Sequence, residues 1–102
     1  MLEKDIEKKG GEYAKKRKVE HYKFTSPARA AVPDRLLLAQ VPEFMRPIIA
    51  RYIRFVEYKA PGKKPTPAQQ REHDRLRALG FMVDVVDSVD GAKSVIDSMG
   101  DE

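Results

Sequence analysis

The segment 66–80 constrains the fold most, because the start signals and the stop signal of one helix frame it. Thr66 is a good N-cap, a proline follows at the first helical position, and Gln69 stands where a capping box places its partner. Gly80 is the residue type that most often ends a helix. The sequence therefore predicts a helix that begins after Thr66 and runs to Leu79.

Hydrophobic periodicity and turn residues give the other elements. Residues 35–39 form a continuous apolar run, which is expected of a strand covered on both faces. Gly10 and Gly11 cost the first helix about 2 kcal/mol relative to alanine. The face of that helix opposite its lysines is made of Ile6, Gly10, Tyr13, Ala14 and Arg17. The predicted elements are helix 3–17, strands 19–25, 35–39 and 51–59, helix 67–79, strand 81–86 and helix 89–99.

This order, αβββαβα, indicates an α/β fold with a mixed central sheet flanked by helices. A chain of 102 residues has the usual size of one domain, so residues 1–102 are predicted to form a single domain with one small active site. Domains this small bury a modest share of their surface, and many gain stability by associating. A homodimer is therefore expected.

Basic side chains are distributed unevenly along the chain. Residues 1–81 carry 19 of the 20 basic side chains and 10 of the 16 acidic ones, a net charge of +9, whereas residues 82–102 carry −5. Such a basic body favours a polyanionic partner such as nucleic acid. A lysine-rich surface that serves only solubility explains the charge equally well.

Composition also limits the chemistry. The chain has no cysteine, which excludes disulfides, thiolate metal sites and cysteine nucleophiles, so any metal ion would have oxygen or imidazole ligands. No apolar run reaches the length of a membrane span, and the charged N-terminus lacks the apolar core of a signal peptide. A cytoplasmic protein without a membrane partner is expected.

Two acidic residues and one lysine are placed to form a reactive site. In the predicted strand 51–59, alternation puts Glu57 and Lys59 on the same face, at the end of the strand. Asp34 stands at the start of the neighbouring apolar strand, where a carboxylate needs a partner. The two acids can hold a hard cation by oxygen ligation, and the lysine can orient the attacking water or stabilise developing charge. The set predicts phosphodiester hydrolysis, and the alternative is that Glu57 and Lys59 form an ordinary exposed pair.

Three further polar residues have simple structural explanations. Gln69 is accounted for as the capping-box partner of Thr66. His21 and His73 could ligate a metal, but neither has a second histidine at a ligand spacing. We therefore expect His21 at a strand edge and His73 on a helix surface.

The segments TSPARAAVPDRLLL (25–38) and FVEYKAPGKKPTPAQQREHDRLRALGF (55–81) closely resemble the virus-type replication-repair nuclease (VRR-NUC) family of the PD-(D/E)xK superfamily. With the acidic first helix, the resemblance covers nearly the whole chain. It implies a restriction-endonuclease-like core and an endonuclease that cleaves DNA with Mg²⁺ or Mn²⁺ and uses no nucleotide cofactor. Free-standing members resemble Holliday-junction resolvases in size, which implies branched DNA as substrate. Less selective duplex cleavage in phage replication or repair, in the host cytoplasm, is the alternative.

The resemblance also implies the roles of single residues. Asp34 and Glu57 match the metal-binding carboxylates, the backbone carbonyl of Tyr58 would add a ligand, and Lys59 matches the catalytic lysine. Glu3 matches an acidic metal ligand of the first helix, where its alternative role is to complement the helix dipole. Gln69 joins the catalytic set. The basic positions of the family, which would grip phosphates or form a solvated face, match Lys23, Arg29 and Arg35.

The chain departs from the family pattern at two places. Ala31 stands where a glycine usually precedes Val-Pro-Asp, which is expected to alter the local turn. The connection 40–52 is longer than the common hairpin, and its apolar side chains are expected to pack on the core or on a second subunit. The rival interpretations are a non-catalytic DNA-binding module and an interaction subunit of a larger nuclease complex.

Overall fold

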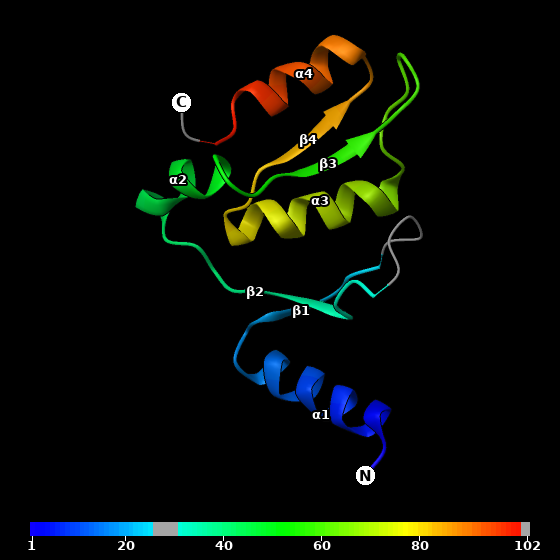
Figure 1. The fold of residues 1–102 in the computed structure, drawn as a ribbon, viewed down its shortest axis with the longest axis vertical. Coiled ribbons are helices and arrows are strands. Elements are labelled where there is room, and N and C mark those ends of the chain that lie inside the picture. Colours follow the sequence, from blue (N-terminus) through cyan, green and yellow to red (C-terminus); the bar gives the residue numbers. More distant parts are fainter. Residues whose placement is uncertain (26–30, 101–102) are drawn as a thin grey trace. The chain divides into compact units, whose positions relative to one another are not determined.

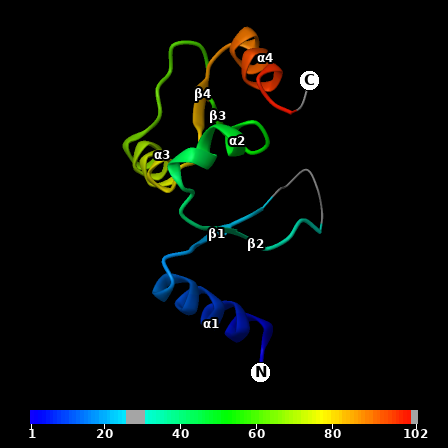
Figure 2. The ribbon, with the colours of Figure 1, turned by 90° about the vertical axis from the view of Figure 1, so that its left-hand side faces the viewer.

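A computed structural model describes residues 1–25 and 31–100 (Figures 1 and 2). The chain divides into two compact units, Met1–Gln40 and Val41–Glu102, and each unit is described by itself. The organisation of residues 1–102 as one domain stays a prediction.

The first unit is a helix followed by a β-hairpin. Helix α1 spans Glu3–Lys16, and strands β1 (Glu20–Lys23) and β2 (Arg35–Leu38) pair antiparallel. The three elements confirm the helix and the two strands predicted for this part of the chain, with shorter strands than expected. Lys23 lies opposite Arg35 in the hairpin, so two cations share its Asp34 end.

The core of the first unit is small. Ala14 and Leu38 are its buried apolar residues among those described, whereas Ile6 and Tyr13 of α1 are exposed. The prediction that β2 is covered on both faces is wrong for Leu37, which is 60% exposed. A two-stranded hairpin offers too little surface to cover the whole face of a helix, so burial is confined to the C-terminal half of α1.

Two glycines in α1 allow that half of the helix to approach β1. A Cβ added to Gly11 would lie 3.2 Å from Nδ1 of His21, and one added to Gly10 would lie 3.9 Å from Nε2 of the same ring. Glycine lowers the helix propensity at these two positions, but its lack of a side chain allows α1 to pack closely against the half-buried His21 of β1.

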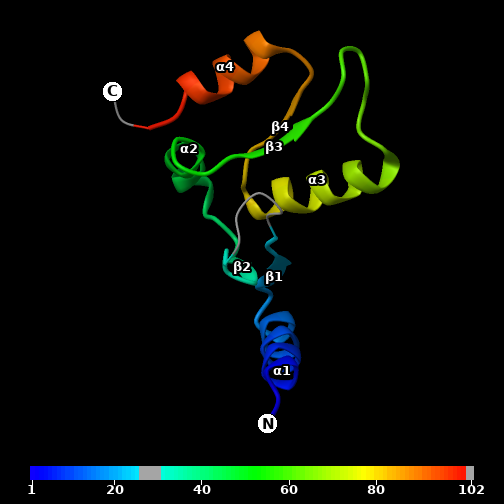
Figure 3. The same cartoon turned by 45° about the vertical axis from the view of Figure 1, so that its right-hand side comes forward.

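The second unit contains a parallel pair of strands flanked by helices. Strand β3 (Phe55–Tyr58) pairs in parallel with β4 (Val83–Val86), and α3 (Pro67–Leu79) connects them. Helix α4 (Val89–Asp97) follows β4, and α3 and α4 lie on opposite sides of the two strands (Figures 1 and 3). The two helices and two strands predicted for this region are confirmed, but residues 51–54 lie outside β3.

The helix signals read from the sequence act as predicted. Thr66 accepts a hydrogen bond from the Gln69 amide at 3.2 Å, and the Gln69 side chain accepts one from the Thr66 amide at 3.0 Å. Gly80 ends α3 with a φ of 105°, which favours glycine. After this turn Phe81 packs edge-to-face on Phe55, with ring centroids 5.8 Å apart. The cap thus directs the chain into the core beside β3.

The connection before β3 packs within the second unit. It forms a short 3₁₀ helix, η1 (Glu43–Met45), and helix α2 (Arg46–Ala50). The amide of the buried Val41 donates to the carbonyl of Leu79 at 2.8 Å, and Nε of Arg46 donates to the Val41 carbonyl at 3.0 Å. The packing predicted for residues 40–52 is therefore intramolecular at Val41, although Phe44 remains 79% exposed.

The α/β class is confirmed, but η1 and α2 stand between β2 and β3, so the predicted order αβββαβα is not met there. In place of one mixed central sheet, the described residues form two separate two-stranded sheets, β1-β2 and β3-β4. The PD-(D/E)xK core therefore stays a prediction. Within residues 1–25 and 31–100, no helix has both the length and the apolar character needed to cross a membrane.

Candidate active site

Glu57 and Lys59 lie at the carboxyl end of β3. Phe55 and Glu57 are half-buried whereas Val56 and Tyr58 are exposed, which confirms the predicted alternation. The amide of Lys59 donates to the carbonyl of Val86 at 2.9 Å, so the pairing with β4 continues to this residue. The carboxyl ends of parallel strands are the usual place of ligand sites in α/β proteins.

Glu57 contacts His73, a residue that the sequence analysis predicted to lie on a helix surface. Nε2 of His73, in α3, lies 3.1 Å from Oε1 of Glu57. The prediction of a helix-surface role for His73 is wrong, because the residue is only 5% exposed. The burial of His73 could have been predicted from its spacing. Leu76, which is buried, lies three residues further on and therefore on the same face of α3.

The same end of the strand pair carries an anchored loop. The amide of Gly62 donates to Oδ2 of Asp87, which follows β4, at 2.9 Å. Gly62 has a φ of 77°, so glycine suits the turn. Beyond this loop, Gln69 completes the capping box of α3, and that structural role is confirmed. The catalytic role of Gln69 stays a prediction.

In the first unit, Asp34 shares a cavity with two glutamates. The cavity, of about 420 Å³, is lined by Leu2, Glu3, Lys4, Glu7 and Asp34. The Asp34 carbonyl accepts a hydrogen bond from the Phe24 amide at 3.0 Å, which fixes the residue at the mouth of the hairpin. Glu3, Glu7 and Asp34 thus line one cavity, and the metal-binding role of Glu3 and Asp34 stays a prediction.

Glu7 is tied to Arg35. Nε of Arg35 donates to Oε2 of Glu7 at 2.9 Å, and another guanidinium nitrogen donates to the His21 carbonyl at 3.2 Å. The hydrogen bond from Arg35, with the charge of the same guanidinium, lowers the pKa of Glu7 below its ordinary value. The guanidinium predicted to grip phosphate thus also joins α1 to the hairpin.

Replacing Arg35 with glutamine is expected to raise the pKa of Glu7 toward its ordinary value, since a hydrogen bond and a positive charge are lost together. A lowered folded-state pKa contributes stability at neutral pH, and this stability is lost as the pH falls through the lowered value. NMR titration of the Glu7 carboxyl measures the shift. Lys4→Gln removes another cation of the cavity as a control, and an unchanged pKa in Arg35→Gln would contradict the pairing.

The turn before Asp34 retains a backbone conformation that favours glycine. Ala31 has a φ of 66°, in the left-handed region, where a Cβ costs roughly 1–2 kcal/mol. The expectation that alanine alters this turn stays a prediction. The chain carries the strain of an alanine at a left-handed position two residues before Pro33.

Ala31→Gly is expected to raise the free energy of unfolding by about 0.5–1 kcal/mol, because relief of the left-handed strain exceeds the entropy that glycine adds to the unfolded chain. Urea denaturation measures the change. Ala68→Gly, in the first turn of α3, is the matched control and should lower stability instead. Destabilisation by Ala31→Gly would refute the strain.

The remaining predicted residues are placed as follows. Lys23 is exposed at the end of β1, His21 is half-buried in the same strand, and Arg29 lies outside the described residues. Asp34 and Glu3 belong to the first unit, and Glu57, Tyr58 and Lys59 belong to the second, so their union in one site stays a prediction. Within the described part of the chain, no three histidine or acidic side chains gather closely enough to hold a metal ion.

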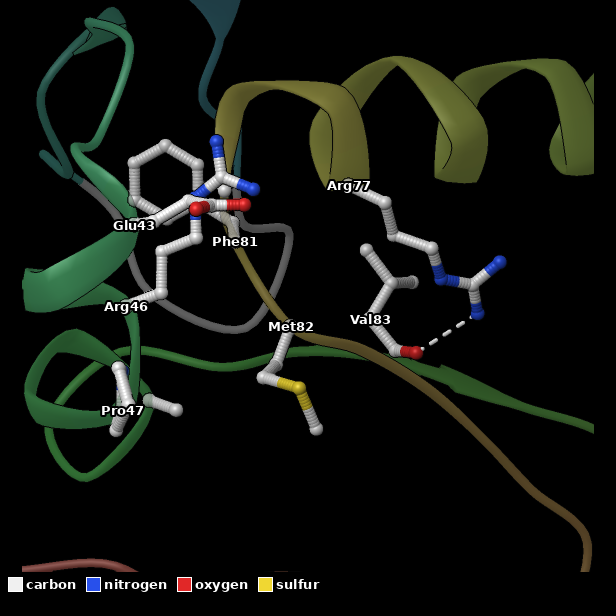
Figure 4. Close-up of a pocket in the computed structure, with 9 residues that line it drawn as sticks. Glu43, Arg46, Pro47, Arg77, Phe81, Met82 and Val83 are labelled. Carbon is white, nitrogen blue, oxygen red and sulfur yellow. Dashed lines mark hydrogen bonds between the residues drawn. The ribbon is translucent and has the colours of Figure 1, made fainter.

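A larger cavity of the second unit is lined by other residues. It has a volume of about 590 Å³ and lies beside α2 and the residues that lead into β4 (Figure 4). Phe81, Met82 and Val83 contribute apolar atoms, and a guanidinium nitrogen of Arg77 donates to the Val83 carbonyl at 2.8 Å. None of the predicted site residues lines this cavity.

Part of the chain is similar to a phage protein. The chain is 52% identical over 69 residues to the protein named "Putative nuclease p44" of Acyrthosiphon pisum secondary endosymbiont phage 1. The match covers 68% of this chain and 64% of that protein. No protein-family model matches the chain. No solved structure matches it. The chain thus spans slightly less than two thirds of the phage protein to which it is similar.

Proposed function

We propose that this protein is a metal-dependent DNA endonuclease whose reactive site joins Asp34, Glu57 and Lys59. The observation that carries the proposal is the placement of Glu57 and Lys59 together at the carboxyl end of β3. The phage relative, which is named as a nuclease, supports the reaction class. The resemblance of the two long segments to the VRR-NUC family supports the assignment of the three residues.

The oxygen donors present fit a hard divalent cation such as Mg²⁺ or Mn²⁺. Asp34 and Glu3 line a common acidic cavity, and Glu57 keeps a second carboxylate oxygen beyond the one that faces His73. Oxygen ligands of this kind are the ones that these ions prefer. Asp34, Glu57, Glu3 and the Tyr58 carbonyl would hold the ion, which when bound would supply Lewis-acid activation of a phosphodiester.

Lys59 is the proposed catalytic side chain that acts on the substrate directly. Its amide is fixed to β4, so the base of the side chain is held on the Glu57 face, and the flexible side chain would turn its ammonium toward a phosphate. There the ammonium orients the attacking water and stabilises the charge that develops on the phosphate oxygens. Gln69, whose amide group is engaged in the helix cap, would position the substrate beside α3.

Cleavage by the purified protein tests this function. Labelled duplex DNA and a four-way junction are incubated with the wild-type chain in Mg²⁺, in Mn²⁺ and in excess chelator. The proposal predicts cleavage with either ion and none in chelator. Retention of activity in chelator would remove the metal mechanism, and binding without cleavage in both ions would favour the rival interpretation as a DNA-binding module.

DNA affinity is expected to fall steeply with salt, because the basic body of residues 1–81 would release counterions from each phosphate that it contacts. Lys23→Ala should reduce the slope of log affinity against log salt by roughly one unit without changing sequence preference. Fluorescence anisotropy at several salt concentrations measures it, with Lys93→Ala in the acidic C-terminal part as the control. A flat salt response would argue against this surface.

The proposal extends to a homodimer that prefers branched DNA. Resolution of a junction needs two symmetric nicks, and a two-fold dimer supplies two copies of one site. Phe44 and Ile48 are exposed on the η1–α2 segment and are our candidates for the interface. Phe44→Glu with Ile48→Glu should give monomers that lose paired nicking, whereas Tyr13→Glu, at an exposed aromatic of α1, should not. A monomeric wild-type protein in sedimentation would refute the dimer.

A further inference from the structure

His73 occupies a position where an apolar residue would suit the fold better. It is one of the two buried residues of α3, together with Leu76. Its ring nitrogen Nδ1 is buried and has no hydrogen-bond partner among the described residues. A buried polar atom without a partner costs roughly 1–3 kcal/mol. Because burial of Nδ1 is unfavourable, we infer that the histidine serves through the contact made by its other ring nitrogen, Nε2.

That other nitrogen contacts the predicted metal ligand. Nε2 lies 3.1 Å from Oε1 of Glu57, and the two side chains are 7% and 29% exposed. A carboxylate oxygen accepts hydrogen bonds, so Nε2 is the donor in this contact, and Nδ1 is the ring nitrogen left without a partner among the described residues. The bond runs from α3 across to β3 and limits the rotation of the Glu57 carboxylate.

The surroundings leave the second carboxylate oxygen available. Val85, the register partner of Glu57, is 40% exposed, so this end of the sheet face is open to solvent. One oxygen therefore faces the buried imidazole while the carboxylate as a whole remains reachable from outside. This is the arrangement in which outer hydrogen bonds orient the ligands of metal ions.

We propose that His73 is a positioning residue that holds Glu57 in the orientation needed to bind the divalent cation. The inference rests on the proposed function and deepens it. His73 itself touches neither the ion nor the DNA and acts through the Glu57 carboxylate. A merely structural role, in which the bond only ties α3 to β3, would change stability and leave the Mn²⁺ affinity of the folded variants unchanged.

A set of variants separates the two roles, because different side chains place a donor at different positions. His73→Gln puts an amide N–H near the position of Nε2, and His73→Asn puts one near the position of Nδ1. His73→Leu removes both donors and suits the buried site beside Leu76. The three variants and the wild-type chain are compared by calorimetric titration with Mn²⁺ and by cleavage of duplex DNA, after circular dichroism has verified the fold.

The proposal predicts that His73→Leu and His73→Asn weaken Mn²⁺ binding about 10–100-fold and that His73→Gln restores most of it. A nitrogen NMR spectrum of the wild-type ring should show the proton on Nε2, and Glu57→Ala should shift that signal. Wild-type affinity in His73→Leu, with the wild-type chain active, would overturn this inference alone. A wild-type chain that neither binds Mn²⁺ nor cleaves DNA would overturn the proposed function as well.

Discussion

Lys59→Ala is expected to lower the rate of metal-dependent DNA cleavage by at least about 100-fold while leaving DNA affinity nearly unchanged. In the proposed mechanism the ammonium acts where charge develops in the transition state, and a single phosphate contact contributes little to ground-state binding. The pairing with Val86 uses the backbone amide of Lys59, so removal of the side chain leaves this bond at the end of β3 intact. Single-turnover cleavage with saturating enzyme measures the chemical step.

The matched control is Lys93→Ala, which removes a lysine from the exposed surface of α4. It should leave the rate within a small factor of the wild-type value. Glu57→Gln, which keeps the shape of the side chain, should abolish cleavage in the same assay, whereas Glu72→Gln on α3 should not. Full activity in Lys59→Ala would remove this lysine from the mechanism without touching the role of the acids.

Arg54→Met is expected to lower the free energy of unfolding by about 3 kcal/mol. Two guanidinium nitrogens of Arg54 donate to the two carboxylate oxygens of Asp84 at 3.0 and 3.1 Å, and a further bond at 2.9 Å reaches Oγ of Ser98. The two side chains of this pair are only 10% and 20% exposed. Removal of the cation would leave Asp84 half-buried without its counter-charge, which is the costly way to break such a pair.

Urea denaturation of a small set of variants tests this cost. Adding Asp84→Val to Arg54→Met removes the stranded carboxylate and should recover much of the loss, because apolar replacement of a whole pair is nearly neutral. Arg75→Met, which breaks a surface contact of 4.0 Å with Glu72, should change stability by less than about 0.5 kcal/mol. Equal effects of Arg54→Met and Arg75→Met would contradict the importance of the buried pair.

Local signals in the sequence predicted the elements well. The Thr66–Gln69 capping box and the Gly80 stop depend on residues a few positions apart, and both are present in the structure. The alternation that places Glu57 on a half-buried face of β3 is also a local property, and it is confirmed. Propensity and spacing are sufficient for such features because the interacting groups are neighbours along the chain.

The start of β3 and the features that depend on distant partners were not predicted. The prediction of a strand over 51–59 is wrong for residues 51–54, because the amides of Tyr52 and Ile53 donate to the Ile49 carbonyl and extend the turn after α2. The burial of His73 against Glu57 and the pairing of Glu7 with Arg35 join residues far apart in sequence. The arrangement of the strands as two small sheets depends on tertiary packing, which the hydrophobic periodicity of single segments does not predict.

Titration with Mn²⁺ of the wild-type chain, Asp34→Asn, Glu57→Gln and the double variant tests most directly whether the acids of the two units hold one ion. Our account predicts that each single variant weakens binding at least about tenfold and that the double variant is little weaker than the worse single one, because residues that share a ligand are not additive. Wild-type Mn²⁺ affinity in either single variant, or losses that simply add, would contradict a site shared between Asp34 and Glu57.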